Sequence, residues 1–190
     1  MNFLLAAIVG YVVGSINPAS IIARIRGVDY RSVGSGNPGA TNISRAMGKK
    51  TGILVAALDI LKGFLPALAF GLLTGDIAVV EVAGLAAVVG HITSPFLRGH
   101  GGKGVATAGG AILAVEWVWL IPVLIVFWLT FALVRRMGIA SVAGGLTLIP
   151  AAILWHPKDD SQIVFAIAMS VLIVARHQSN IRELLASRHS

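Results

Sequence analysis

The sequence predicts an all-α integral membrane protein with seven transmembrane helices, some of them short or broken. Three observations predict this class: 56% of the 190 residues are hydrophobic, only 12% are charged, and long apolar runs recur along the whole chain. Soluble domains carry about 25% charged residues, so this chain lacks the polar side chains that would cover a globular surface. The polar stretches are too short for a separate soluble domain, and we expect one membrane domain over residues 1–190.

Seven apolar runs are candidates for the helices, since a helix needs about 20 apolar residues, with roughly 17 to 25 as the usual range, to cross the hydrocarbon core. They cover residues 3–23, 51–74, 77–97, 104–116, 117–134, 139–155 and 161–176. The first run has no charge and lacks the basic region of a signal peptide, so we expect a retained helix. The fourth, sixth and seventh runs are short, which predicts tilted helices or half-helices packed inside the protein.

The distribution of charge predicts the orientation. Seven crossings place thirteen of the fifteen cations on one side: Arg24, Arg26, Arg31, Arg45, Lys49, Lys50, Arg98, Lys103, Arg135, Arg136, Arg176, Arg182 and Arg188. The positive-inside rule makes that face cytoplasmic, with the N-terminus outside and the C-terminus inside. Trp117, Trp119 and Trp155 would then be aromatics of the outer interface.

Composition also excludes some partners and chemistry. The chain has no cysteine, which excludes disulfides, thiolate metal sites and a thioester intermediate on the protein. The net charge of +7 would suit nucleic acid, but basic cytoplasmic loops explain the same excess in a membrane protein. We therefore expect no nucleic-acid partner.

The first polar segment on the basic face contains GSGNPGATN at residues 34–42. Glycines permit positive φ and let successive backbone N–H groups converge on an anion, to which Ser35, Asn37, Thr41 and Asn42 would add side-chain donors. The alternative is a flexible loop whose neighbouring cations only enforce topology. The density of small residues among arginines favours an anion site.

The second segment reads GHITSPFLRGHGGKGVAT at residues 90–107. It lacks the spacing GxxxxGK[ST], so a Walker nucleotide site is not expected. Gly101 and Gly102 precede Lys103, and a helix that begins near Gly104 would direct N–H groups and an ammonium at a phosphate. A lysine that merely extends from a span end to the interface would leave these glycines unexplained. No spacing here supports a metal site.

The third segment reads HQSNIRELL at residues 177–185. His177 and Asn180 are three residues apart and would share a helical face, presenting a proton acceptor and an amide donor. A surface helix lying on the membrane is the alternative, and the two readings are compatible.

Three further polar residues lie within the apolar runs. Asp59 and Lys62 are expected to compensate one another as a structural pair, with a role in positioning the site as the second option. Ser141, at the cytoplasmic start of the sixth run, would either donate to a phosphate or cap its helix.

Taken in order, these segments resemble the bacterial acyl-phosphate:glycerol-3-phosphate acyltransferases, the PlsY family. The resemblance is carried by GSINPASIIARIRGVDYRSVGSGNPGATN (14–42), LDILKG (58–63), GHITSPFLRGHGGKGVAT (90–107) and HQSNI (177–181). It implies transfer of a fatty acyl group from acyl phosphate to the 1-hydroxyl of glycerol 3-phosphate, the first acylation of phospholipid synthesis, giving lysophosphatidic acid and inorganic phosphate. It also implies a monomer in the bacterial cytoplasmic membrane, surrounded by lipid, with no cofactor or metal and with active-site loops at 24–50, 90–107 and 176–190 facing the cytoplasm.

The chain departs from the family pattern at several positions. Asn17 intervenes before Pro18, the second segment has Ser94 before its proline, and Glu183 replaces a basic residue. These changes affect the shape of the second loop and the tail but leave the expected donors in place.

The resemblance implies a role for each candidate residue. A cradle for the acyl phosphate would consist of Ser35, Gly36, Asn37, Gly39, Thr41 and Asn42. The glycerol 3-phosphate would be held by Arg45, Lys103 and Ser141, with His177 and Asn180 completing the pocket. The substrate-binding residues of the second loop would also include Gly101, Gly102, Gly104 and Thr107. Lys103, His177 and Asn180 are the catalytic candidates, and Lys103 would also stabilise charge on the carbonyl oxygen. Either His177 or the phosphate oxygens of the donor would take the proton, and we favour the phosphate.

Two other classes remain open at this point. A transporter of a phosphorylated metabolite would use similar broken helices, but with a midplane site and inverted repeats that the sequence does not show. A phosphatidyltransferase acting on a CDP-lipid would need a run of aspartates, and the basic face offers only Asp29 and Glu183.

Overall fold

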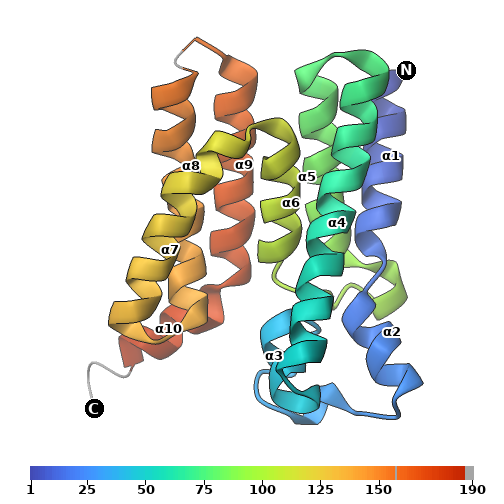
Figure 1. Ribbon diagram of the computed structural model, residues 1–190, viewed down its shortest axis with the longest axis vertical. Helices are drawn as coiled ribbons and strands as arrows, with labels where there is room; N and C mark the ends of the chain where they lie inside the picture. Colours follow the sequence, from blue (N-terminus) through green and yellow to red (C-terminus); the bar gives the residue numbers. More distant parts are fainter. Residues whose placement is uncertain (157, 187–190) are drawn as a thin grey trace. The chain divides into compact units, whose positions relative to one another are not determined.

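The computed structural model describes residues 1–156 and 158–186, and over these residues it is helical with no strand, which confirms the all-α class (Figure 1). The chain divides into two compact units, one from residue 1 to 115 and one from residue 116 onward. Each unit is described by itself. The single membrane domain expected from the sequence stays a prediction.

The first unit is built around four apolar helices that lie side by side (Figure 1): α1 (Asn2–Ser15), α4 (Lys49–Thr74), α5 (Ile77–Thr93) and α6 (Val105–Val115). Small residues bring their backbones close together, because a Cβ on Gly14 would overlap the backbone of Ala87, and one on Gly63 would overlap that of Thr107. Toward one end lie the shorter elements α2 (Pro18–Ile25), η1 (Tyr30–Ser32), α3 (Ala40–Met47) and η2 (Pro95–Leu97).

The first apolar run is not the single helix that the sequence predicts over residues 3–23. It breaks between Ser15 and Pro18, and Asn17 adopts an extended conformation with φ −112° and ψ 98°. Proline has no N–H and disfavours the helical conformation in the residue before it. The Asn17 side chain then caps the new helix by accepting a hydrogen bond of 2.8 Å from the Ser20 N–H.

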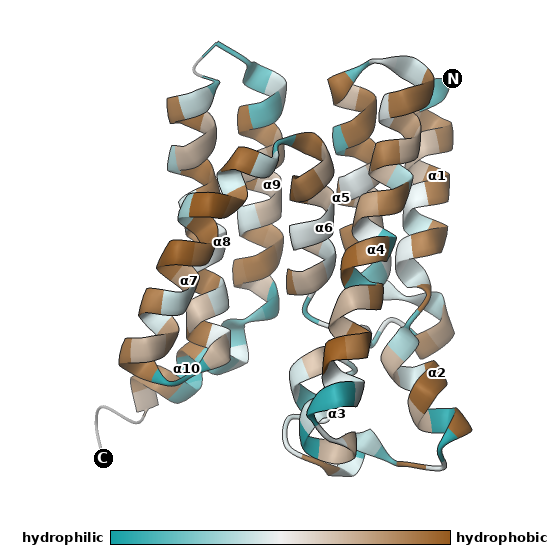
Figure 2. Cartoon of the chain, in the orientation of Figure 1, coloured by the Kyte–Doolittle hydropathy of each residue, from teal (hydrophilic) through white to brown (hydrophobic). Residues whose placement is uncertain are grey.

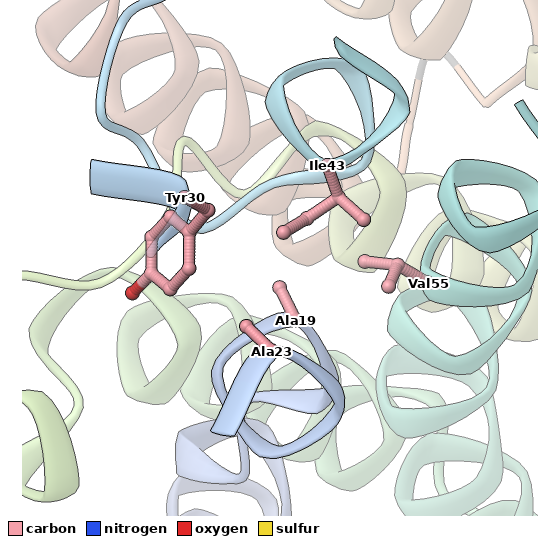
Figure 3. Close-up of a cluster of buried hydrophobic side chains, with 5 residues drawn as sticks. All are labelled: Ala19, Ala23, Tyr30, Ile43 and Val55. Atoms are coloured by element: carbon pink, nitrogen blue, oxygen red, sulfur yellow. The ribbon is translucent and has the colours of Figure 1, made fainter. Parts of the chain in front are cut away.

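The polar segment 24–50 has a small core of its own, which the sequence did not predict. The side chains of Ala19, Ala23, Tyr30, Ile43 and Val55 are buried against one another and join α2, η1, α3 and α4 (Figure 3). This cluster anchors both ends of the glycine-rich stretch, so that stretch is part of a packed substructure.

The second unit contains η3 (Trp117–Trp119), α7 (Leu120–Val134), α8 (Met137–Trp155), α9 (Asp160–Arg176) and α10 (Gln178–Ala186). Helix α8 packs against both α7 and α9, and the Ser170 hydroxyl donates to the Gly145 carbonyl at 2.7 Å. Helix α10 bends away from α9 by 55°. The sequence predicted Trp119 to be an interfacial aromatic, and this is wrong because Trp119 is fully buried. Its ring lies edge-on to His156, with 6.1 Å between the ring centroids. Trp117, by contrast, is exposed.

The membrane character follows from the helices themselves. Within the described residues, five helical segments are long and apolar enough to span a bilayer when α1 and α2 are taken as one segment, and α9 with α10 makes a sixth if the bent pair is one span. Helix α6, with 11 residues, is shorter than a span. Figure 2 shows hydrophilic residues gathered at α3, whereas α1, α4, α5 and α6 are mainly white to brown. Each of the seven predicted runs coincides with helix, but the seven crossings and the orientation stay predictions.

Candidate active site

The glycine-rich stretch forms a tight loop whose backbone conformation requires glycine at two positions. Gly34 and Gly36 have φ of +56° and +64°, in the left-handed region that side chains disfavour. A Cβ on Gly34 would lie 2.6 Å from Asn42 Oδ1 and 3.1 Å from a guanidinium nitrogen of Arg45. The loop therefore lies directly against the Arg45 side chain, and the structure brings these two predicted features together.

The side chain of Asn42 holds this loop in place through hydrogen bonds. It is 2% exposed, its Oδ1 accepts from the Ser35 N–H at 3.1 Å, and its Nδ2 donates to the Tyr30 carbonyl at 2.9 Å. The Gly36 N–H likewise donates to the Val33 carbonyl at 3.0 Å. The N–H groups of Ser35 and Gly36 are thus bonded within the chain, and the expectation that they converge on an anion is wrong. Asn42, expected as a donor to the anion, instead holds the loop in shape.

Donors that face outward come from the loop and from the start of α3. Ser35 and Thr41 are exposed, and the Asn37 amide lies against Gly39, where a Cβ would approach its Nδ2 to 2.9 Å. The N–H groups of Ala40 and Thr41 are in the first turn of α3 and have no intrahelical acceptor, as at any helix start. The loop thus offers hydroxyl, amide and backbone donors beside a guanidinium, which suits a phosphate.

The second glycine loop is pinned to the end of α5. The Gly101 N–H donates to the Ile92 carbonyl at 3.0 Å, and the Gly102 N–H donates to the His91 carbonyl at 3.2 Å. Gly104 has φ +81° and leads into α6. Lys103 lies between these fixed glycines, two residues before the first residue of α6, and is half-buried.

Thr107 is the third residue of α6 and is fully buried. Its Oγ1 makes no hydrogen bond to the described residues. Because the side chain is fully buried, Thr107 packs inside the first unit and does not face solvent.

Residues 15–17, at the break between α1 and α2, connect the two loops. The Asn17 Nδ2 donates to the Pro38 carbonyl in the first loop at 3.3 Å. The Ser94 hydroxyl, at the start of the segment that leads to the second loop, donates to the Ser15 carbonyl at 2.6 Å. Sequence reasoning missed this connection, although the Asn-Pro pair at 17–18 signals a helix start.

In the second unit, His177 caps the end of α9 and is 2% exposed. Its Nδ1 lies 2.7 Å from the Ile173 carbonyl oxygen. A carbonyl oxygen only accepts, so Nδ1 carries the proton and the lone pair of the neutral ring is on Nε2. The backbone of its own helix thereby fixes the orientation of the imidazole.

Asn180 lies against the first turn of α8. A Cβ on Gly138 would approach Asn180 Cγ to 2.5 Å, so a glycine is needed there. Ser141 follows Gly138 by three residues and shares its helical face. The Ser141 hydroxyl donates to the Met137 carbonyl at 2.9 Å, so it bonds to its own helix and does not accept from a helix N–H as a cap would.

The structure thus groups the predicted residues within each unit. Residues 34–45 and 101–107 lie toward the same end of the first unit (Figure 1), and Ser141, His177 and Asn180 belong to the second. Among the described residues, no group of three His, Asp or Glu side chains is arranged to hold a metal ion.

Comparison with known proteins now identifies the family. A family model described as glycerol-3-phosphate acyltransferase matches residues 4–187. A glycerol-3-phosphate acyltransferase of Aquifex aeolicus (strain VF5) is 42% identical over 198 residues, which cover 99% of this chain and 98% of that protein. The chain belongs to the glycerol-3-phosphate acyltransferase family.

Other members of the glycerol-3-phosphate acyltransferase family agree in sequence and fold. Glycerol-3-phosphate acyltransferase 1 of Deinococcus radiodurans is 40% identical over 191 residues, covering 98% of this chain and 93% of that protein. The crystal structure of PlsY (YgiH), an integral membrane glycerol 3-phosphate acyltransferase, superposes in its glycerol 3-phosphate form with a TM-score of 0.92 and 39% identity, covering 99% of this chain and 94% of that chain. The lysophosphatidic acid form of the same protein superposes with a TM-score of 0.91 and 38% sequence identity. The resemblance to the PlsY family is confirmed.

Proposed function

We propose that this chain transfers a fatty acyl group from acyl phosphate to the 1-hydroxyl of glycerol 3-phosphate, releasing lysophosphatidic acid and inorganic phosphate. The observation that carries the proposal is the pair of fixed glycine loops at one end of the first unit. One lies against Arg45 and the other holds Lys103 at the start of α6. Two phosphate-bearing substrates require two anion sites, and these loops supply them.

Acyl phosphate is the donor that suits the residues of this chain. The chain has no cysteine, so it cannot carry an acyl group as a thioester on the protein. A mixed anhydride is already activated, and its phosphate is a good leaving group that a glycine loop with hydroxyl and amide donors would bind. The reaction then needs positioning and charge stabilisation more than covalent catalysis.

We assign the acyl-phosphate cradle to Ser35, Gly36, Asn37, Gly39 and Thr41, with Asn42 positioning the loop from below. The glycerol 3-phosphate is assigned to Arg45 and Lys103, and Ser141, His177 and Asn180 are the further candidates for binding it. Lys103 also stabilises negative charge on the carbonyl oxygen as the hydroxyl attacks.

The proton is proposed to pass to the substrate. The 1-hydroxyl oxygen attacks the carbonyl carbon, the bond from that carbon to the phosphate oxygen breaks, and the departing phosphate takes the hydroxyl proton. His177 supports this route because its ring is locked by the bond to Ile173 and is suited to orient the acceptor. The step needs no metal or cofactor, and the protein would act as a monomer in the cytoplasmic membrane.

The first experiment measures phosphate release by purified protein in detergent, given palmitoyl phosphate and glycerol 3-phosphate with EDTA and without CoA. We expect activity that depends on both substrates, and a loss of roughly 10²- to 10³-fold in kcat in Lys103→Ala. Lys158→Ala, which removes an exposed cation outside the three predicted loops, is the matched control and should keep near wild-type activity. Inactive, well-folded wild type would contradict the proposal, and uptake by proteoliposomes would then be measured.

A second experiment tests the proton route through His177. Glutamine can donate to the Ile173 carbonyl but is not a base near neutral pH, so His177→Gln should lose less than about 10-fold in kcat if the ring only orients the acceptor. General-base catalysis contributes roughly 10²- to 10⁴-fold. A loss in that range, together with disappearance of an acidic limb in the pH profile of wild-type kcat, would assign the proton to His177.

A further inference from the structure

A buried cluster of polar side chains in the first unit has no role in the assignments above. Asp59 and Lys62 lie in α4 and His91 lies in α5, and their exposed fractions are 2%, 6% and 3%. Lys62 Nζ is 2.9 Å from Asp59 Oδ1, and His91 Nδ1 is 3.5 Å from the same oxygen. The expected pairing of Asp59 with Lys62 is confirmed. Burying such charges is costly, so the cluster calls for a reason beyond mutual compensation.

At one end of the cluster, Lys62 contacts the break between α1 and α2. Lys62 Nζ donates to the Ile16 carbonyl at 2.7 Å, where α1 has ended and the carbonyl has no helical partner. The residues on either side of Ile16 are those that contact the loops: the Ser15 carbonyl accepts from Ser94, and Asn17 donates to Pro38. The Lys62 ammonium therefore fixes the segment that both loops touch.

At the other end of the cluster, His91 contacts the second loop. The His91 carbonyl accepts the Gly102 N–H at 3.2 Å. Gly102 also lies on the imidazole edge, since a Cβ there would overlap His91 Nε2. The next residue is Lys103. A rotation of the His91 ring would thus displace the backbone from which the Lys103 side chain extends.

We propose that Asp59, Lys62 and His91 are positioning residues that set the geometry of both substrate loops, through Ile16 on one side and Gly102 on the other. This inference rests on the proposed function, because it concerns the residues assigned there to the substrates. The three side chains act through the backbone of the loops and do not touch substrate. Salt-bridge compensation alone would require neither the bond to Ile16 nor the contact with Gly102.

The first test removes both charges together. Asp59→Asn alone leaves the Lys62 ammonium buried without a counter-charge and should lower both the melting temperature and the activity. Asp59→Asn/Lys62→Met removes the unpaired charge, so its melting temperature should recover. Its kcat/KM for glycerol 3-phosphate should remain roughly 10- to 100-fold below wild type, because displaced loops misplace the reacting groups. Recovery of activity together with stability would overturn the proposal.

A control variant separates stability from positioning. Val79 lies in the same helix as His91, 1% exposed, twelve residues toward the other end. Val79→Ala should lower the melting temperature through the lost packing while leaving kcat/KM per folded molecule unchanged. If this variant loses activity in proportion to its stability, the losses in the Asp59 and Lys62 variants reflect stability alone, and the proposal is wrong.

The second test asks whether His91 acts through Lys103. Glycerol 3-phosphate binding is measured calorimetrically for wild type, His91→Gln, Lys103→Ala and the double variant. We expect His91→Gln to weaken binding about 10-fold in wild type but less than about twofold in Lys103→Ala, because coupled residues are non-additive. Equal losses in both backgrounds would overturn the proposal. Binding does not require the acyl donor, so wild type that binds glycerol 3-phosphate but does not turn over acyl phosphate would contradict only the proposed donor.

Discussion

At the scale of single residues, a comparison of Gly27 with Gly34 distinguishes the effect of backbone conformation from the effect of side-chain contact. Their φ angles are +62° and +56°, so alanine at either position costs about 1 to 2 kcal/mol of left-handed strain. A Cβ on Gly27 meets nothing within 4 Å, whereas one on Gly34 displaces Asn42 and Arg45. We expect a lower melting temperature for Gly34→Ala than for Gly27→Ala, and a rise of roughly 10-fold in KM for a phosphate substrate in Gly34→Ala alone. Equal KM values in the two variants would show that the loop contacts do not matter for binding.

The sequence was sufficient to predict which residues suit an anion, but it did not predict which of them would bind substrate and which would only hold the loop in shape. Composition and spacing indicated that residues 34–42 and 101–104 suit an anion. They did not show that Asn42 is buried with both ends of its amide bonded to the chain, because those bonds join residues 7 and 12 positions apart. Such contacts depend on the core around Tyr30 and Ile43, which only the folded chain assembles.

At the scale of elements, the start of α9 gives a prediction with a defined dependence on pH. Hydrogen bonds from the Gln162 N–H and from Ser161 hold the pKa of Asp159 below its usual 3.8. The contribution of this cap is therefore present above about pH 4 and is lost as the pH falls through the lowered pKa. Asp159→Ala should destabilise the protein by about 1 kcal/mol at pH 7. Melting temperatures of the two proteins should converge toward pH 3, and a gap that stays constant would contradict this account.

The lengths of the apolar runs located every long helix but not the interruption of the first. Residues 3–23 read as one apolar run, and Pro18 was the only signal of the break at 16–17. Prolines occur inside other helices here, at Pro66 in α4 and Pro150 in α8, without ending them. The break before Pro18 differs from these two prolines because polar side chains stabilise it. Asn17 caps the start of α2, and Lys62 donates a hydrogen bond to the Ile16 carbonyl.

At the scale of the whole molecule, the predicted orientation can be tested because the chain has no cysteine. Lys49→Cys and Lys158→Cys each introduce one exposed thiol, at the predicted cytoplasmic and outer faces. In intact spheroplasts, a membrane-impermeant maleimide should label the residue-158 variant and leave the residue-49 variant unlabelled until the membrane is opened. Labelling of both sites, or of residue 49 alone, would overturn the assigned topology.

The small core beneath the first loop has a kinetic and thermodynamic consequence. A segment with the composition GSGNPG suggests a hinge that orders only when a ligand arrives. Here the amides of Ser35 and Gly36 are already bonded and the segment is anchored by Tyr30 and Ile43. The loop is therefore preorganised: its ordering entropy is lost during folding rather than on binding. Its amides should exchange hydrogen slowly even without ligand, and substrate should associate in a single step without a prior rearrangement.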